Sequence, residues 1–370
     1  MNQPLIPLVT PTERFRGLLF GTAIGDALGL PREGLEPARA RRLFPEPFRH
    51  RMFLGYGVTS DDTDHTLMVA RALLKHPHDP AAFARALSWY LRLWILSLPP
   101  GIGFATLRSI AKLWCGFGPT SSGVFSAGNG PAMRVAPIGA FFAQQPELRE
   151  VYVRASTLIT HTDPRALIAA QAVAEMAAWI MDKAMPHDLY PETLIWKLDG
   201  VADIKGIDPD SDAVVEWKHL VTEVGRALEK NLTVTAFAQA LDLGHGISGY
   251  AYHTVIMAIY AWFHHRNDFH GTIESIIACG GDTDTTAAIA GALAGATTGT
   301  SGIPNPWKMY LVDWPRSIAF YWEMGSAMAE AYAGQHARTP WYFTPGLLVK
   351  NLATLPILLL HVMRRLLPPY

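Results

Sequence analysis

The apolar residues of this chain recur mostly at intervals of three and four, which is the period of an amphipathic helix and not of a strand. The segments with this pattern open with residue types that favour a helix start, such as Ser, Asp and Pro. The clearest predicted helices are residues 63–75, 79–95, 164–184 and 248–263. The third of these is apolar on nearly every face, as expected of a helix that other helices surround.

Few runs of β-branched residues occur, and no alternation of strands with helices is apparent, so the pattern predicts an all-α fold. With 370 residues, 49% of them apolar and only 17% charged, the chain is long and apolar enough to bury a large core. We expect one compact multi-helix domain over residues 10–334 and a C-terminal helical appendage over residues 335–370.

Three segments rich in Gly, Pro or Ser read as long connections, at residues 31–57, 99–134 and 189–212. Connections of this length within a compact domain usually carry function. The middle one is the richest in glycine and serine, and we expect it to contribute to a binding site.

The apolar tail of the chain is interrupted by Pro356, His361 and the pair Arg364–Arg365. These interruptions predict a docked or interfacial helix and no membrane span. The N-terminal segment lacks the basic and apolar regions of a signal peptide.

Only two cysteines, Cys115 and Cys279, are present, which excludes a disulfide framework and fits a reducing cytoplasm. Cys279, beside glycines, is interpreted as a small buried hydrophobe. The net charge of −1 gives no electrostatic reason to expect a nucleic acid partner.

Two acidic clusters, SDDTDH at residues 60–65 and GGDTDTT at residues 280–286, each stand directly before an apolar helix. Asp and Thr are common helix caps. One cap is sufficient, however, and neighbouring carboxylates repel each other unless a cation lies between them. Carboxylates and hydroxyls suit Mg²⁺, Mn²⁺ or Ca²⁺, and four or more Asp oxygens suggest a two-metal site.

Residues 282–286 also fit the D-x-D-x-T nucleophile motif of haloacid-dehalogenase-type phosphatases. In that family the first Asp ends a hydrophobic strand of a parallel sheet. Here Gly280 and Gly281 precede it, after a helical sequence, and no sheet is apparent. The phosphatase interpretation is therefore disfavoured.

Five segments, in this order, resemble the ADP-ribosylglycohydrolase family, which includes dinitrogenase-reductase-activating glycohydrolase and the ADP-ribosylarginine and ADP-ribosylserine hydrolases. The resemblance covers residues 14–296. The segments are GLLFGTAIGDALGLPRE, SDDTD, SAGNGPAMRVAPIG, STLITHTDPRAL and CGGDTDTTAAIAGALAGA.

The resemblance implies an all-α fold whose metal site is formed by helix N-termini and loops and holds two Mg²⁺ or Mn²⁺ ions. It also implies hydrolysis of the bond between the distal ribose of ADP-ribose and a protein side chain. Ser60 stands where the family usually has Thr, and keeps the hydroxyl. The implied metal ligands are Ser60, Asp61, Asp62, Asp282, Asp284 and Thr285.

For catalysis, the resemblance and general chemistry point to metal-assisted attack of water on the anomeric carbon. Asp61 and Asp284 are the candidate proton acceptors. Glu33 matches a mobile-loop Glu that some members place on the metal centre.

For substrate binding, the resemblance implies a loop near the diphosphate and distal ribose, in which Ala127 replaces an aromatic residue of several relatives. Glycines there would let backbone N–H groups point at phosphate oxygens. The implied substrate-binding residues are Ser126, Gly128, Asn129, Gly130 and His161.

The predicted protein is thus a cytoplasmic, monomeric hydrolase that acts on ADP-ribosylated protein and releases ADP-ribose. We expect the N-glycosidic bond to arginine as its target, since the opening segment and the second cluster look like those of the activating glycohydrolases. Two alternatives stay open. One is hydrolysis of O-linked ADP-ribosylserine or of small ADP-ribose conjugates, and the other is a non-catalytic ADP-ribose-binding relative.

Overall fold

The computed structural model describes residues 9–45, 48–182, 190–365 and 367–368. Within these ranges the fold is helical, as predicted, and its two short strands, β1 (Gly57–Val58) and β2 (Leu311–Val312), pair in parallel. Two short 3-10 helices, η1 (Leu30–Arg32) and η2 (Ala132–Arg134), accompany the α-helices. The α-helices are α1 (Pro11–Gly29), α2 (Pro37–Leu43), α3 (Asp61–Lys75), α4 (Pro80–Ile95), α5 (Phe104–Trp114), α6 (Ala136–Phe141), α7 (Pro146–Leu158), α8 (Pro164–Met181), α9 (Pro191–Gly200), α10 (Asp212–Glu229), α11 (Val234–Ala240), α12 (Ala251–His265), α13 (Phe269–Ile277), α14 (Thr283–Thr298), α15 (Asn305–Met309), α16 (Ile318–Tyr332) and α17 (Gly346–Arg365).

The four clearest predicted helices are confirmed as α3, α4, α8 and α12, each within a few residues of the expected bounds. Helix α8 is buried almost throughout, as its sequence indicated. Residues 183 and 184, at the predicted end of α8, lie outside the described residues.

The prediction of three long connections is partly wrong, because each contains a short helix: α2, α5 and α9. Helix α5 illustrates the cause. It buries Ile110 and Leu113 on one face and leaves Phe104 exposed. Its amphipathic pattern is only three turns long, and the flanking Gly, Pro and Ser residues concealed it. The predicted start of the third connection, Leu189, lies outside the described residues.

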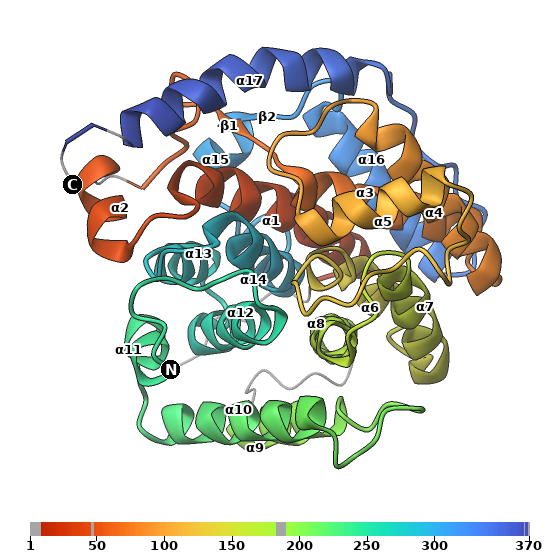
Figure 1. Ribbon diagram of the computed structural model, residues 1–370, viewed down its shortest axis with the longest axis horizontal. Helices are drawn as coiled ribbons and strands as arrows, with labels where there is room; N and C mark the ends of the chain where they lie inside the picture. The colour runs from red at the N-terminus through yellow and green to blue at the C-terminus, as the bar shows by residue number, and fades with distance from the viewer. Residues whose placement is uncertain (1–8, 46–47, 183–189, 366, 369–370) are drawn as a thin grey trace, which may run out of the picture.

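Helices α1 and α14 form the central pair of the fold and run antiparallel, backbone against backbone (Figure 1). Four glycines of α1, spaced four residues apart, face α14: Gly17, Gly21, Gly25 and Gly29. A Cβ atom at Gly21 would lie 1.9 Å from the Gly291 carbonyl oxygen, so no larger residue permits this approach. The pairing brings the C-terminal half of α1 beside the N-terminus of α14.

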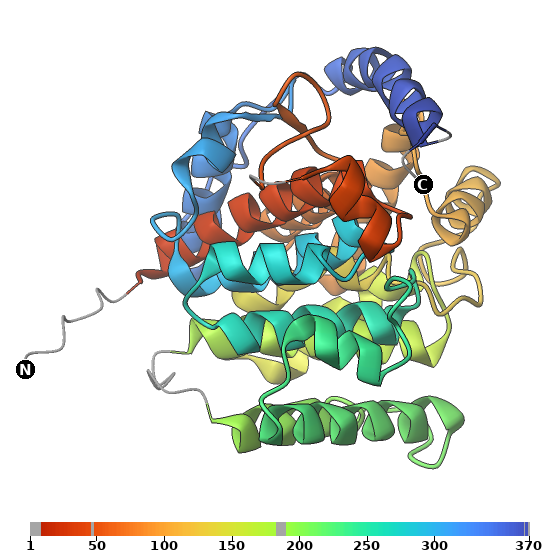
Figure 2. The same cartoon turned by 90° about the vertical axis from the view of Figure 1, so that its left-hand side faces the viewer.

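The remaining helices stack in layers on either side of this pair (Figures 1 and 2). Helices α8 and α12 lie on one side, with α9 and α10 beyond them at the far end of the molecule. Helix α17 lies at the opposite end. One large apolar cluster runs through the layers and includes the fully buried Trp217 and Trp262, and the removal of this apolar surface from water is the main force that stabilises the fold.

Helix α17 is held against the rest of the molecule by polar side chains. The Lys350 ammonium donates to Asp313 Oδ1 at 2.7 Å and to Thr59 Oγ1 at 2.8 Å. The Asn351 amide donates to the Ser97 carbonyl oxygen at 2.8 Å. The predicted division between residues 334 and 335 falls in the segment between α16 and α17, and it stays a prediction.

Candidate active site

The N-terminus of α3 is anchored by a carboxylate from α1. Asp26 is fully buried and accepts hydrogen bonds from the backbone N–H groups of Ser60, at 3.0 and 2.9 Å, and Thr63, at 3.2 Å. These are N–H groups that the first turn of a helix leaves without a partner. Burial raises the pKa of Asp26 to about 6, although these hydrogen bonds oppose the shift. Asp26 thus joins α1 to the first acidic cluster.

The two acidic clusters, distant in sequence, meet at this point. Asp26, Asp62 and Asp284 each offer a carboxylate oxygen, and these three oxygens lie within 4.8 Å of one another. All three side chains are buried, and one oxygen of Asp62 and one of Asp284 have no hydrogen-bond partner. Burial, followed by repulsion from neighbouring carboxylates, raises the pKa of Asp62 and of Asp284 well above the ordinary value. Orphaned, buried carboxylate oxygens of this kind fit a hard divalent cation.

Hydroxyl groups from both clusters converge on one of these carboxylates. Ser60 caps α3, and its hydroxyl donates to Asp62 Oδ2 at 3.1 Å. Thr285, from the first turn of α14, donates to the same oxygen at 3.2 Å. Asp61 lies beside this group, and its pKa is raised by burial and by repulsion from Asp26.

Of the six predicted ligands, Asp62 and Asp284 belong to the close group with Asp26, and Ser60 and Thr285 donate to Asp62. Asp61 and Asp282 lie outside this close group but near enough to raise the pKa of Asp62 by repulsion. The metal roles of all six stay predictions. Sequence reasoning missed Asp26 as a seventh oxygen donor. Its signal was a single carboxylate within the apolar run GLLFGTAIGDALGL, where an unpaired charge is costly.

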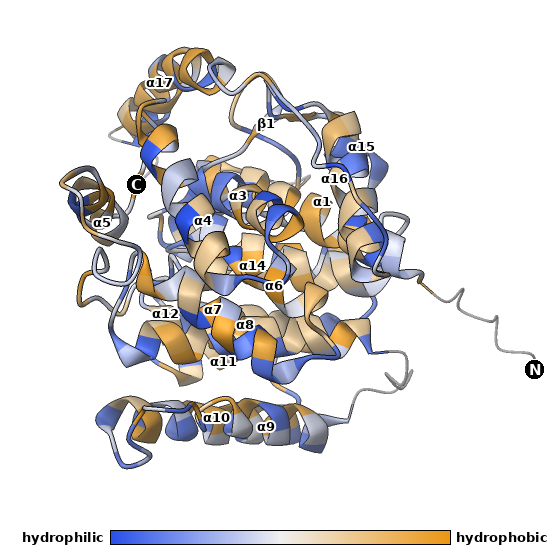
Figure 3. Ribbon diagram, turned by 90° about the vertical axis from the view of Figure 1, so that its right-hand side faces the viewer, coloured by the Kyte–Doolittle hydropathy of each residue, from blue (hydrophilic) through white to orange (hydrophobic). Residues whose placement is uncertain are grey.

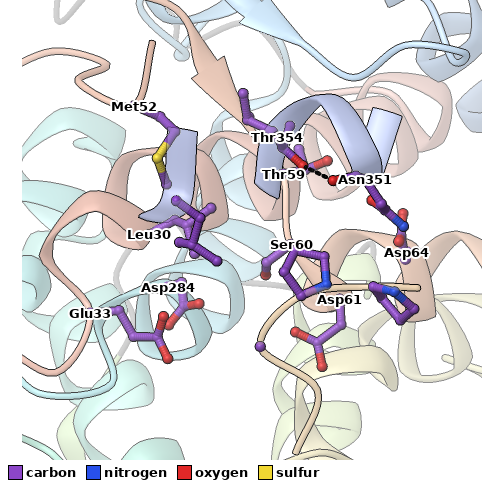
Figure 4. A pocket seen from close by; sticks show the side chains of 15 residues that line it. Leu30, Glu33, Met52, Thr59, Ser60, Asp61, Asp64, Asp284, Asn351 and Thr354 are labelled. Atoms are coloured by element: carbon purple, nitrogen blue, oxygen red, sulfur yellow. Dashed lines mark hydrogen bonds between the residues drawn. The ribbon is translucent and has the colours of Figure 1, made fainter. Parts of the chain in front are cut away.

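Four acidic residues, Glu33, Asp61, Asp64 and Asp284, line a cavity that α17 helps to enclose (Figure 4). In this view the carboxylates of Glu33 and Asp284 lie next to each other, and Ser60 and Asp61 lie across from them. The side of the cavity formed by α17 carries Asn351, Thr354 and Leu358.

Glu33 is positioned by the chain that follows it. The Gly34 N–H donates to the Gly281 carbonyl oxygen at 2.7 Å, and the Gly281 N–H donates to the Leu35 carbonyl oxygen at 2.9 Å. This bridge fixes Glu33 beside the second acidic cluster. Burial, followed by repulsion from Asp282, raises the pKa of Glu33.

The second cluster requires glycine at position 281. Gly281 has φ of +78°, and a Cβ atom there would lie 2.1 Å from the Ile247 carbonyl oxygen. Only glycine combines this conformation with this approach. The glycine lets the chain pair with both Leu35 and Ile247 immediately before Asp282 begins the turn into α14.

The predicted substrate loop lies against the second cluster. The Asn129 amide donates to Asp282 Oδ2 at 2.6 Å and to Thr254 Oγ1 at 3.1 Å. The Asn129 N–H also donates to the Gly249 carbonyl oxygen at 3.0 Å. Ser126 accepts a hydrogen bond from the Gly128 N–H at 3.3 Å. The structure thus brings the substrate loop and the acidic cluster together.

His161 lies beneath this loop. It is 2% exposed, and Cβ atoms added at Gly128 and Gly130 would lie 3.1 and 3.2 Å from its ring. The two glycines therefore admit the imidazole, and their predicted contact with phosphate stays a prediction. Burial and the nearby Arg134 lower the pKa of His161 to about 3, so the ring is neutral at physiological pH.

Two further charged residues of the site region were not assigned a role from the sequence. Asp64 accepts from the Trp94 indole at 2.8 Å and pairs with Arg316, so it is a supporting residue. Arg134 is fully buried and donates to the Ser156 carbonyl oxygen at 2.8 Å. Burial lowers the pKa of Arg134 to about 9, and the nearby Asp61 opposes this shift. Its only sequence signal was its place in the segment SAGNGPAMR.

Comparisons with known proteins agree with the family resemblance of the sequence motifs. The family model for ADP-ribosylglycohydrolase matches residues 7–337. An uncharacterized protein of Archaeoglobus fulgidus is 32% identical, over 81% of this chain and 92% of its own length. ADP-ribosylhydrolase ARH3 of Gallus gallus is 27% identical, and ADP-ribosyl-[dinitrogen reductase] glycohydrolase of Rhodospirillum rubrum is 26% identical, each over 80% of this chain and 89% of its own length.

A solved structure named "ADP-ribosylglycohydrolase-related protein complex" superposes with a TM-score of 0.62 and 27% identity, over 88% of this chain and 99% of its own. The helical fold is thus that of an ADP-ribosylglycohydrolase-related protein. The chain belongs to the ADP-ribosylglycohydrolase family, as the sequence motifs predicted, and members of this family hydrolytically remove ADP-ribose from modified substrates.

Proposed function

We propose that this protein hydrolyses the N-glycosidic bond between ADP-ribose and arginine side chains of modified proteins. The observation that carries the proposal is the set of carboxylates around the cavity, where Glu33 and Asp284 lie next to each other and Asp61 lies across from them. A guanidinium group carries a positive charge and several N–H donors. The Glu33 carboxylate, which is not among the predicted metal ligands, complements both properties, and it complements the neutral oxygen of an O-linked serine less well.

The same carboxylates suit the metal ions on which the family depends. Two Mg²⁺ or Mn²⁺ ions would be held by Asp26 together with the predicted ligands Ser60, Asp61, Asp62, Asp282, Asp284 and Thr285. The orphaned oxygens of Asp62 and Asp284 support this assignment. When bound, such ions would polarise oxygen ligands and stabilise negative charge that develops on them.

The residues of the chain supply the proton transfer. Asp61 and Asp284 line the cavity, and either carboxylate accepts a proton from the water that attacks the anomeric carbon. The bond from that carbon to the arginine nitrogen breaks, and the nitrogen takes up the proton that the carboxylate received from the water. Glu33, fixed beside Asp284, is the third candidate for this transfer. Asn129 orients Asp282 through its 2.6 Å hydrogen bond.

The test is the release of ADP-ribose from arginine-modified and serine-modified protein side by side, with Mg²⁺, with Mn²⁺ and with a chelator. We expect release from arginine-modified protein, and its loss in Asp62→Ala, in Asp284→Ala and on chelation. Faster release from the serine conjugate would replace the arginine assignment with the O-linked alternative. Unchanged turnover in either variant would contradict the metal mechanism.

A binding measurement separates the enzyme from a non-catalytic binder. Calorimetry with ADP-ribose beside the turnover assay would show binding without release if the chain only binds the product.

We further propose that the protein acts as a monomer in the cytoplasm. The two cysteines support this compartment, since both are free and Cys279 is buried, as predicted.

A further inference from the structure

Helix α17 has its apolar side facing away from the protein. Two of its polar residues, Lys350 and Asn351, point inward beside the buried Leu347 and are 7% and 5% exposed. Its large apolar residues point outward, and Leu360 and Met363 are 66% and 62% exposed. We call this set the α17 outer face: Leu348, Val349, Leu352, Leu355, Leu359, Leu360, Val362 and Met363.

This polarity is the reverse of that of an ordinary surface helix, whose apolar stripe faces the core. By length and composition α17 is also the helix of the described residues that could cross a membrane, although only 22% of its most apolar window is buried within the protein. Figure 3 shows α17 at the edge of the molecule, coloured largely as hydrophobic. A continuous strip of large apolar side chains on the outside of a protein, such as the α17 outer face, indicates a contact with a partner or a membrane.

Aromatic side chains lie at the N-terminal end of α17. Trp341 is 77% exposed, and Phe343 and Trp314 are about half exposed. The start of α17 packs against Trp314, because a Cβ atom at Gly346 would lie 3.0 Å from its ring. Trp is a residue that membrane–water interfaces favour.

Arginines lie at the other end of the helix. Arg49, Arg51 and Arg364 line one hollow. Leu360 of the α17 outer face and the exposed Leu54 also line it. Arg39 donates to the carbonyl oxygen of Arg365 nearby. Residues 331–370 contain no Asp or Glu, so the charged side chains of the α17 segment are all basic.

From these observations we propose that α17 lies flat on an anionic lipid surface, with the α17 outer face in the acyl–headgroup boundary and the arginines on lipid phosphates. An outward apolar face with flanking arginines and aromatic residues is the composition of an interfacial helix. In a symmetric pairing through α17, the same segment of a second copy would offer the arginines no Asp or Glu. A membrane span would require Lys350 to leave its bonds to Asp313 and Thr59.

The test is co-sedimentation of the full chain with vesicles of phosphatidylcholine alone or mixed with phosphatidylglycerol. We expect binding to the mixed vesicles, weakened by salt and at least about tenfold stronger than to the neutral ones. The double variant Leu352→Glu/Leu359→Glu should bind at least about tenfold more weakly, and Arg364→Glu should also bind more weakly. The matched control is Val215→Glu, which adds a carboxylate to an exposed position of α10 at the opposite end of the molecule, and it should bind like the unaltered chain.

The remaining outcomes distinguish a lipid surface from the other possible contacts of the α17 outer face. No sedimentation with anionic vesicles, or equal binding by the double variant, overturns the proposal. A dimer in light scattering that the double variant abolishes, without vesicle binding, assigns the outer face to a second copy. Bound protein that only detergent releases, and not high salt or alkaline carbonate, indicates a span and also overturns it. Because these readouts do not use turnover, the result is independent of the proposed hydrolysis.

Discussion

At the scale of single residues, the site is a group of carboxylates held where water cannot solvate them. The hydroxyls of Ser60 and Thr285 share one oxygen of Asp62, and the other oxygen has no partner. Such an arrangement is unfavourable for a charged group unless a cation compensates it. Asp26, to which sequence reasoning assigned no role, therefore offers a test of whether this group of carboxylates binds a cation.

Replacing Asp26 by Asn keeps a side-chain oxygen that can accept hydrogen bonds from the backbone N–H groups at the start of α3, but it removes one negative charge from the cluster. We expect Mn²⁺ affinity to fall by about 10–100-fold, as for groups that orient or support a metal site, and turnover to fall with it. Calorimetric titration with Mn²⁺ measures this. The matched control is Asp210→Asn at an exposed loop position, which should leave affinity unchanged. Equal affinities in the two variants would remove Asp26 from the site.

At the scale of elements, the geometry of the site depends on how closely α1 and α14 approach. The glycines of α1 contact the backbone of α14, and this contact determines the distance between Asp26 and Asp284. The four-residue spacing of these glycines is visible in the sequence, but only the structure shows which helix they face.

The substitution Gly21→Ala would place a methyl group within 1.9 Å of the Gly291 carbonyl oxygen and force the two helices apart. We expect a loss of about 1–3 kcal/mol or more in the free energy of unfolding, as for overpacked interiors, together with weaker metal binding. Urea denaturation measures the loss.

The control for this variant is Gly225→Ala within α10, where the nearest atom to the new methyl group is a side-chain carbon of Ile195 at 3.8 Å. Ala favours a helix more than Gly does, so this variant should be as stable as the unaltered chain or about 1 kcal/mol more stable. Equal destabilisation by both substitutions would argue against close packing of α1 on α14.

At the scale of the whole molecule, the carboxylates couple stability to pH and to metal. The pKa of Asp26 is raised to about 6, and the pKa values of Asp62 and Asp284 are raised well above the ordinary value of an aspartate. A raised folded-state pKa means that the stability contribution is complete below the unfolded-state pKa, near 3.9, and is lost as pH rises through the folded-state pKa. The metal-free protein should therefore lose stability from about pH 4 to pH 6 and above.

Divalent cations bind the ionised carboxylates, so they should restore this stability where the loss is greatest. We expect Mn²⁺ or Mg²⁺ to raise the Tm more at pH 7.5 than at pH 5. Thermal melts with each ion at both pH values measure this, and Na⁺ at equal ionic strength is the control. A rise of equal size at both pH values would contradict the coupling of these carboxylates to metal.

Much of the molecule could be predicted from the sequence. The three- and four-residue periodicity located α3, α4, α8 and α12, because a buried helix must repeat its apolar residues along one face. The two acidic clusters and the substrate loop were recognisable from the order of their motifs, and the family followed from them. Helices α2, α5 and α9 were missed, since two or three turns between glycines and prolines carry too little periodicity.

The contacts between α1, α3 and α14 and the orientation of α17 depend on the tertiary structure and could not be predicted from the motifs. Local sequence determines where a helix begins, but only packing determines that the starts of α3 and α14 meet on Asp26 of α1. Packing also placed the polar side of α17 against the protein and its apolar side outward, because the buried partners of Lys350 and Asn351 lie far away in the sequence, at Asp313 and Ser97. Contacts between distant segments depend on the shape of the whole fold, and no short stretch of sequence contains that information.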